Sequence, residues 1–334
     1  MATRRSLLLA GLGSVTAAAV GQRGKAYAAP ALQAVRIVIP QDSVFVLTYL
    51  GAKDAGVFAK HGIELDVDPR PFAGYLAGLP SKECMVASYS GIDAIQKIDD
   101  GLEWVILGGG LTVVQNILVR KDSLFQTPAD LRGKKLGTYS TSAASFKCAR
   151  AAIIDAFKLD IFKDVHVQQV AGPALTKLVE NGQLDAMVNI SSLSIAAEAL
   201  TDKFRVLFSA NDYWTQKTGY PIVWPGPLVA WRSWVDDDPS RAKRFAAATE
   251  ESFRWLKKPE NLETAVKNHG ALAGVRTPAD VAEYKTWLQS KHLLMTSWNR
   301  KAVDAQWKFL ELCQRTGVIG NVPAEDKYAL FVES

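Results

Sequence analysis

The chain from residue 34 onward alternates short apolar runs, rich in valine and isoleucine, with longer stretches whose apolar positions recur at helical spacing. Such alternation predicts an α/β fold, in which helices cover the faces of parallel-type sheets. The expected strands are residues 35–39, 63–67, 84–88, 103–107, 116–120, 135–138, 165–170, 186–190, 205–208 and 228–231. The expected helices are residues 44–60, 73–79, 92–99, 143–157, 174–181, 193–200, 239–257, 260–268, 278–289 and 300–316.

Two glycine- or proline-rich segments interrupt this pattern. Gly108-Gly109-Gly110 lacks the spacing of a dinucleotide-binding loop and is interpreted as a flexible turn. Residues 221–227 hold three prolines and a glycine, which indicates a hinge.

These breaks predict two lobes. We expect residues 34–115 to form the first part of lobe 1, 116–221 to form lobe 2, and 222–334 to return to lobe 1 and end in a helical tail. The chain would cross between the lobes near 112–118 and 222–229, which makes a two-strand hinge. Ligands of open parallel sheets bind at the carboxyl ends of the strands. The pattern therefore predicts a ligand cleft between the lobes.

The N-terminus has the features of an export signal. The pair Arg4-Arg5 precedes an apolar run too short to span a membrane, and residues 26–28 have the small-x-small pattern of a cleavage site. Residues 1–28 therefore predict a twin-arginine signal peptide cleaved near Ala28, with a Sec signal as the alternative. No cysteine precedes Cys84, so we expect no lipid anchor and a mature protein that is free in the periplasm.

Removing this leader changes the charge of the chain. Four of the 39 lysines and arginines lie in residues 1–28, which contain no acidic residue, so the remainder is almost neutral. Nucleic-acid binding needs a clustered basic face and is not expected. Cys84, Cys148 and Cys313 are widely spaced; one disulfide remains open, and buried free thiols are the default.

Three motifs resemble a known family. The run 127–138 (TPADLRGKKLGT) resembles the segment that opens lobe 2 in the nitrate/sulfonate/taurine-type solute-binding proteins of ABC importers, which are related to pyrimidine-precursor synthases. Residues 182–186 (GQLDA) and 238–242 (DPSRA) are similar to two further family segments. Where the family has a Gly-x-x-Asp turn, this chain has Ser-Lys-Glu-Cys at 81–84. The resemblance implies a two-lobed periplasmic-binding-protein fold.

Polar residues follow several of the expected strands. The hydroxyl-rich loop 138–145 lies between a strand and a helix N-terminus, where unpaired backbone N–H groups and the helix dipole favour an anion. Simple N-capping is the alternative. Trp224, beside the second crossover, could stack on a planar ligand or pack in the hinge. The candidate ligand-binding residues are Ser43, Val44, Ser88, Tyr89, Ser90, Ser140, Thr141, Ser142, Ser145, Asn189, Ser191 and Trp224.

Catalytic motifs are missing from the sequence. The four histidines are scattered, and there is no zinc-protease helix, phosphate-binding loop, nucleophile elbow or cysteine-dense iron motif like that of the related synthases. We therefore expect neither an enzyme nor a cofactor.

The sequence predicts a monomeric periplasmic protein that closes on a small molecule and delivers it to an ABC permease in the inner membrane. The expected ligand is a small organic anion or ring compound of sulfonate, nitrate, carboxylate or pyrimidine type. A synthase-like enzyme and a ligand-sensing protein on the same scaffold are the alternatives.

Overall fold

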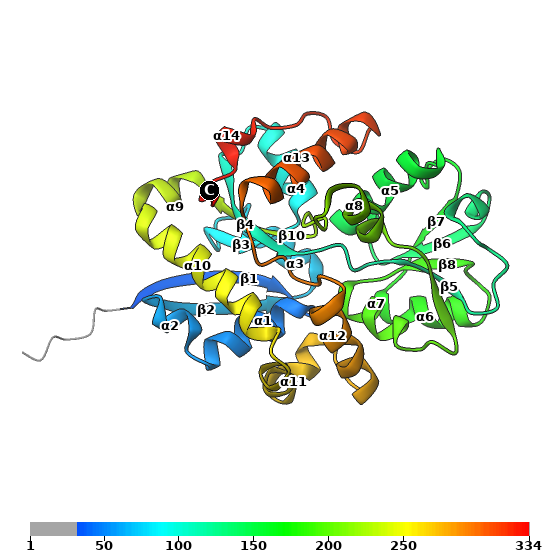
Figure 1. Cartoon of the computed structure of the whole chain (residues 1–334), viewed down its shortest axis with the longest axis horizontal. Coiled ribbons are helices and arrows are strands. Elements are labelled where there is room, and N and C mark those ends of the chain that lie inside the picture. The colour runs from blue at the N-terminus through cyan, green and yellow to red at the C-terminus, as the bar shows by residue number, and fades with distance from the viewer. Residues whose placement is uncertain (1–31, 334) are drawn as a thin grey trace, which may run out of the picture. The chain divides into compact units, whose positions relative to one another are not determined.

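The computed structural model describes residues 32–333 (Figure 1). The predicted signal peptide, residues 1–28, lies outside the described residues. None of the helices in the described range is both long and apolar enough to cross a membrane.

Ten strands form three sheets in this range. The strands are β1 (Gln33–Pro40), β2 (Ile63–Arg70), β3 (Val86–Ser88), β4 (Trp104–Leu111), β5 (Ile117–Arg120), β6 (Lys135–Thr138), β7 (His166–Gln169), β8 (Ala186–Val188), β9 (Phe204–Phe208) and β10 (Gly226–Trp231). The sheet orders are β1-β2, β3-β10-β4 and β7-β6-β8-β5-β9. The five-stranded sheet is thus built between residues 117 and 208, and β10 returns to strands formed before residue 112.

Helices flank these sheets, and the chain ends in a mainly helical segment (Figure 1). The helices are α1 (Val44–Asp54), α2 (Val57–Lys60), α3 (Phe72–Gly78), α4 (Gly91–Asp99), the 3-10 helix η1 (Pro128–Leu131), α5 (Ala144–Phe157), α6 (Gly172–Glu180), α7 (Ser191–Glu198), α8 (Ala210–Thr218), α9 (Arg232–Asp237), α10 (Pro239–Leu256), α11 (Pro259–Ala273), α12 (Pro278–Ser290), α13 (Arg300–Arg315) and α14 (Glu325–Tyr328). The predicted α/β class is confirmed. The lobe boundaries stay a prediction.

The three sheets differ in strand direction, and only the five-stranded sheet is mixed. β1 pairs with β2, and β6 with β7 and β8, in parallel, as the alternation of strands and helices predicts. The strands that follow the two crossovers run the other way: β5 is antiparallel to β8 and β9, and β10 to β3 and β4. The crossovers also contact each other, since Val113 N donates to the carbonyl of Ile222 at 3.0 Å.

Two local expectations are corrected. The helical stretch 44–60 is broken after α1, because Gly56 adopts a left-handed conformation (φ 74°) and α2 starts afresh. The triplet 108–110 is not a turn but part of β4. A Cβ on Gly110 would lie 2.0 Å from the carbonyl oxygen of Gly226, so glycine is needed there for the close approach of β10.

Candidate functional site

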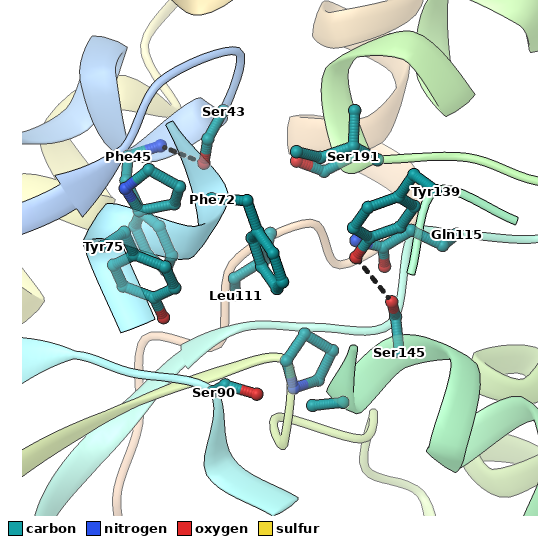
Figure 2. Close-up of a pocket in the computed structure, with 14 residues that line it drawn as sticks. Ser43, Phe45, Phe72, Tyr75, Ser90, Leu111, Gln115, Tyr139, Ser145 and Ser191 are labelled. Atoms are coloured by element: carbon teal, nitrogen blue, oxygen red, sulfur yellow. Dashed lines mark hydrogen bonds between the residues drawn. The ribbon is translucent and has the colours of Figure 1, made fainter. Parts of the chain in front are cut away.

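A pocket lies where the ends of several strands meet the crossovers (Figure 2). Its volume is about 30 Å³, which leaves room for only a very small group. The lining residues are Pro40, Ser43, Phe45, Phe72, Tyr75, Ser90, Leu111, Gln115, Tyr139, Ala144, Ser145, Ile190, Ser191 and Pro225.

Four helices begin at this pocket. The residues at or just before the starts of α1, α4, α5 and α7 all belong to its lining. Each of these helices follows a strand, namely β1, β3, β6 or β8, so the α/β alternation itself brings the helix starts together. The first N–H groups of a helix lack intrahelical partners and carry the positive end of its dipole. The pocket is therefore suited to an anion.

Two of the lining serines sit at helix N-caps. The Ser43 Oγ accepts a hydrogen bond from Phe45 N at 3.2 Å, which leaves its own proton available to a ligand. The Ser90 hydroxyl makes no cap bond and instead donates to Asp93, whose other oxygen accepts from Lys147 Nζ at 2.6 Å. The Asp93–Lys147 ion pair thus contacts Ser90 but does not belong to the pocket lining.

Ser145 and Tyr139 form a linked pair on α5 and the loop before it. Their hydroxyl oxygens lie 3.2 Å apart. Burial raises the pKa of Tyr139 to about 12, so the phenol stays neutral and can donate a hydrogen bond at neutral pH.

Gln115 and Ser191 are the lining residues whose hydrogen-bond donors are free to bind a ligand. Their exposed fractions are 4% and 2%. Gln115 Oε1 accepts from Val114 N at 3.2 Å, but within residues 32–333 neither Gln115 Nε2 nor the Ser191 hydroxyl has a hydrogen-bond partner. Neither atom is among the fully buried unpaired side-chain atoms of the described residues, so both donors are open to the pocket and can bond to a ligand.

The pocket lining, which lies entirely within residues 32–333, contains no lysine, arginine, aspartate or glutamate. Neutral donors and helix dipoles therefore supply the polarity of the pocket. No group of three or more metal-ligating side chains is placed to hold a metal ion within residues 32–333.

Four of the predicted site residues line the pocket, and eight do not. Ser43, Ser90, Ser145 and Ser191 are brought together in its wall. The other polar side chains bond within the protein: Ser88 to Tyr49 and Tyr89 to Leu76. Asn189 bonds to Gly172 and Trp224 to Gln306. Val44 is buried.

The hydroxyl loop 140–142 lies beside the lining. Thr141 donates from its N and Oγ1 to Gln169 Oε1, and the Ser140 and Ser142 hydroxyls lie 2.9 Å apart. Helix α5 starts only at Ala144, with Ala143 as its N-cap, so these three hydroxyls do not reach the first turn.

Several lining residues were missed by sequence reasoning. Gln115 lies in the predicted crossover, so a polar side chain there was a signal that could have been followed. Phe72 and Tyr75 belong to α3, which begins two residues after β2 ends, so they too follow a strand end. They were missed because only the polar residues after the strands were considered, apart from Val44 and Trp224.

The cysteines and two histidines lie elsewhere. All three cysteines are buried and free, and burial raises the pKa of Cys84 to about 11. His61 pairs with Glu251 and His269 with Asp54, both at 2.8 Å and away from the pocket lining.

These sheets, crossovers and helices make up a periplasmic-binding-protein fold. Residues 45–261 match the family described as NMT1/THI5 like, and the chain belongs to this family. The resemblance inferred from residues 127–138, 182–186 and 238–242 is thereby confirmed. No curated protein sequence matches the chain significantly.

Solved structures of this fold include both binding proteins and an enzyme. The periplasmic aliphatic sulphonate binding protein SsuA of Escherichia coli is 18% identical, with a TM-score of 0.69 over 90% of this chain and 93% of that one. The alkanesulfonate-binding protein SsuA of Xanthomonas axonopodis pv. citri, bound to MOPS, is 15% identical, with a TM-score of 0.65 over 89% and 96%. The desulfurization enzyme DSZB is 14% identical, with a TM-score of 0.58 over 89% and 96%. At these identities the likeness establishes a shared fold.

Proposed function

We propose that this protein is the solute-binding component of an ABC importer and captures a small organic anion in the pocket described above. The observation that carries the proposal is the pair of unpaired donors in the pocket wall, Gln115 Nε2 and Ser191 Oγ, which lie beside four helix starts with no side-chain cation in the lining. Hydrogen-bond donors and helix dipoles can hold a sulfonate or carboxylate without a full counter-charge. The sulfonate-binding proteins of the same fold support this ligand class.

The wall of the pocket comes from both sides of the crossovers, which supports binding by closure. Ser43, Phe45 and Tyr75 lie on one side, and Tyr139, Ser145 and Ser191 on the other (Figure 2). A ligand that contacts both sides stabilises the closed state relative to the open one. The closed, loaded form would then dock on an inner-membrane permease as a monomer.

Export through residues 1–28 is part of the same proposal. The twin-arginine leader would place the protein in the periplasm, where a carrier can diffuse between solute and permease. The export machinery and the permease are then its partners.

Binding can be tested by titrating the purified protein with organic anions in a calorimeter and by following its thermal unfolding. The panel is ethanesulfonate, taurine, benzenesulfonate, propionate, benzoate and nitrate, with benzylamine as the cationic control. We expect at least one anion to bind and to raise the melting temperature, and benzylamine to do neither. Failure of every anion would contradict the proposal, and turnover of a panel member into product would favour the enzyme.

Ser191→Ala and Ser194→Ala form a matched pair for this test. Both serines lie on α7, both are buried, and only Ser191 lines the pocket. Loss of a hydrogen bond to a charged ligand costs about 1.5–3 kcal/mol, so Ser191→Ala should weaken binding by about tenfold or more. Ser194→Ala should leave the affinity unchanged.

A further inference from the structure

Aromatic rings occupy the space between the polar walls of the pocket. The Phe72 ring lies between the two sides in Figure 2. Its centroid is 5.5 Å from that of Tyr139 across the crossovers, at an interplanar angle of 84°, and 5.9 Å from that of Tyr75 on its own helix. Phe72 packs against the core around β3 and β4 and also against the core of the five-stranded sheet.

The two tyrosine rings have fixed orientations. Tyr75 donates its hydroxyl hydrogen bond to the carbonyl of Ser88 at 3.0 Å, and the Tyr139 hydroxyl pairs with Ser145. Their polar ends are thus directed at the protein, and both residues belong to the pocket lining. The pocket therefore presents aromatic carbon to whatever lies between them.

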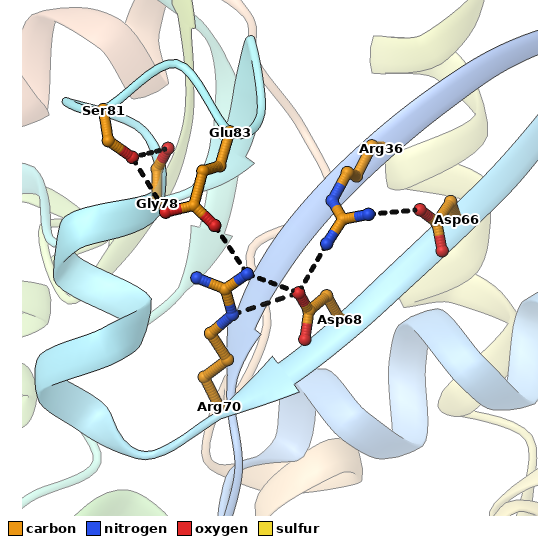
Figure 3. Close-up of polar contacts among 7 residues, drawn as sticks. All are labelled: Arg36, Asp66, Asp68, Arg70, Gly78, Ser81 and Glu83. Atoms are coloured by element: carbon orange, nitrogen blue, oxygen red, sulfur yellow. Dashed lines mark hydrogen bonds and ion pairs between the residues drawn. The ribbon is translucent and has the colours of Figure 1, made fainter.

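A charged network anchors the segment that carries Phe72 (Figure 3). Arg70 Nη2 lies 2.6 Å from Asp68 and 2.6 Å from Glu83, and Asp68 also accepts from Arg36 at 2.7 Å. Hydrogen bonds from Arg70 lower the pKa of both carboxyls, which keeps them ionised. Glu83 belongs to the segment 81–84 that departs from the family pattern, so this chain uses that segment to hold β2 just before Phe72.

Phe72 is half-buried, as is Tyr139, whereas Tyr75 is buried. It is the first residue of the seven-residue helix α3, whose N-cap Pro71 makes no side-chain cap bond. The ring therefore has a fixed backbone and an open face toward the pocket, where the remaining volume is about 30 Å³. Binding of a planar group therefore requires this ring or the two sides of the pocket to move.

We propose that the ligand is an aromatic anion, whose ring packs against Phe72, Tyr75 and Tyr139 while its charged group accepts hydrogen bonds from Gln115 and Ser191. This inference rests on the proposed function and narrows its ligand class. Aromatic rings gain from edge-to-face and offset contacts beyond their burial, and an alkyl chain does not. Phe72 then acts as the residue that favours a ligand with an aromatic ring over a ligand with an alkyl chain.

The experiment compares two matched pairs of ligands by isothermal titration of the purified protein. The two ligands of a pair share the anionic group and differ in having an aromatic ring or an alkyl chain. The pairs are benzenesulfonate with ethanesulfonate, and benzoate with propionate. In at least one pair the wild-type protein should bind the aromatic member about tenfold more tightly. Phe72→Leu keeps an apolar side chain but no ring, and should reduce this preference to about twofold, because the aromatic anion loses more affinity than the alkyl anion does.

Phe162→Leu is the matched control, because Phe162 is 43% exposed and makes an edge-to-face contact with Phe146 outside the pocket lining. It should retain the wild-type preference, and melting curves check that both variants fold. Equal binding of aromatic and alkyl anions, or a preference that survives in Phe72→Leu, would overturn the inference and leave the proposed function intact. Binding of no anion at all would instead contradict the proposed function.

Discussion

At the scale of single residues, Gly110 and Gly226 decide how closely β4 and β10 approach. A Cβ on Gly110 would meet the Gly226 carbonyl at 2.0 Å, and one on Gly226 would meet the Phe45 ring at 2.4 Å. Phe45, Leu111 and Pro225 beside them line the pocket. Gly110, predicted to lie in a turn, and Gly226, predicted to lie in a hinge, therefore belong to the close strand contact beside the site.

Gly110→Ala should destabilise the protein, and Gly108→Ala should not. The two glycines lie in the same strand, but a Cβ on Gly108 would have Leu228 as its nearest neighbour, at 3.9 Å. Backbone displacement around Gly110 should cost about 2 kcal/mol or more in the free energy of unfolding. Urea unfolding measures both variants, and a Gly110→Ala protein as stable as wild type would refute this account of β4.

The residues of the pocket were predictable only where local chemistry marks them. Ser43 and Ser90 precede helices after a strand, which is a signal that a sequence carries by itself. Loop 140–142 carries the same signal, yet its hydroxyls bond to one another and to Gln169. Which hydroxyls face the pocket depends on where α5 begins, and one extra residue at Ala143 moves them off its first turn.

At the scale of elements, α7 connects the pocket to the C-terminal helices. It begins with Ser191 in the pocket lining and ends with Glu198, a side chain only 4% exposed. Glu198 accepts from Asn116 Nδ2 at 3.0 Å and from Lys291 Nζ at 3.4 Å, and Lys291 also pairs with Glu283 of α12 at 2.8 Å. Beside them, the Ser192 and Tyr284 hydroxyls lie 2.6 Å apart.

This buried carboxyl should make stability fall as pH rises. Burial, opposed by Lys291 and reinforced by Glu283, raises the pKa of Glu198 from 4.5 to about 7. The folded state therefore holds a proton that the unfolded state has lost between about pH 4.5 and 7, so the stabilising contribution is complete below that range and lost above it. The loss amounts to about 3 kcal/mol at most.

Urea unfolding of Glu198→Gln between pH 5 and 8 measures this contribution. The stability of the variant relative to wild type should rise by about 2–3 kcal/mol across the range, because glutamine does not titrate. Glu263→Gln, which alters a carboxyl 63% exposed beside Lys285, serves as the control and should show no such trend. A relative stability of Glu198→Gln that is flat with pH would contradict the assignment.

Most elements follow from periodicity, and the exceptions have physical causes. The periods of 2 and 3.6 predict β6 and α5 to within a residue, because each has a clear apolar pattern and a local boundary signal. Helix α8 was not expected, since its segment is largely polar and its boundaries depend on the Ser209 cap and on Gly219. Periodicity could not predict strand direction either, because β5 and β10 run antiparallel to their neighbours only as a result of the crossovers.

At the scale of the whole molecule, the α/β alternation and the two crossovers explain why a site forms at all. A helix that starts at the pocket follows each of the strands β1, β3, β6 and β8. The end of β4 supplies Leu111, and the crossovers supply Gln115 and Pro225. The proposed ligand class depends above all on Gln115 and Phe72. The polar side chain of Gln115 in the predicted crossover was a usable signal, whereas the contact of Phe72 with Tyr139 depends on tertiary packing.

A crystal structure of the protein with the tightest-binding anion of the panel tests directly whether neutral donors hold the ligand. We expect the charged group within about 2.7–3.2 Å of Gln115 Nε2 and Ser191 Oγ, with no lysine or arginine side chain in contact. An anion bound elsewhere on the protein, or held in the pocket by a lysine or arginine, would contradict this expectation.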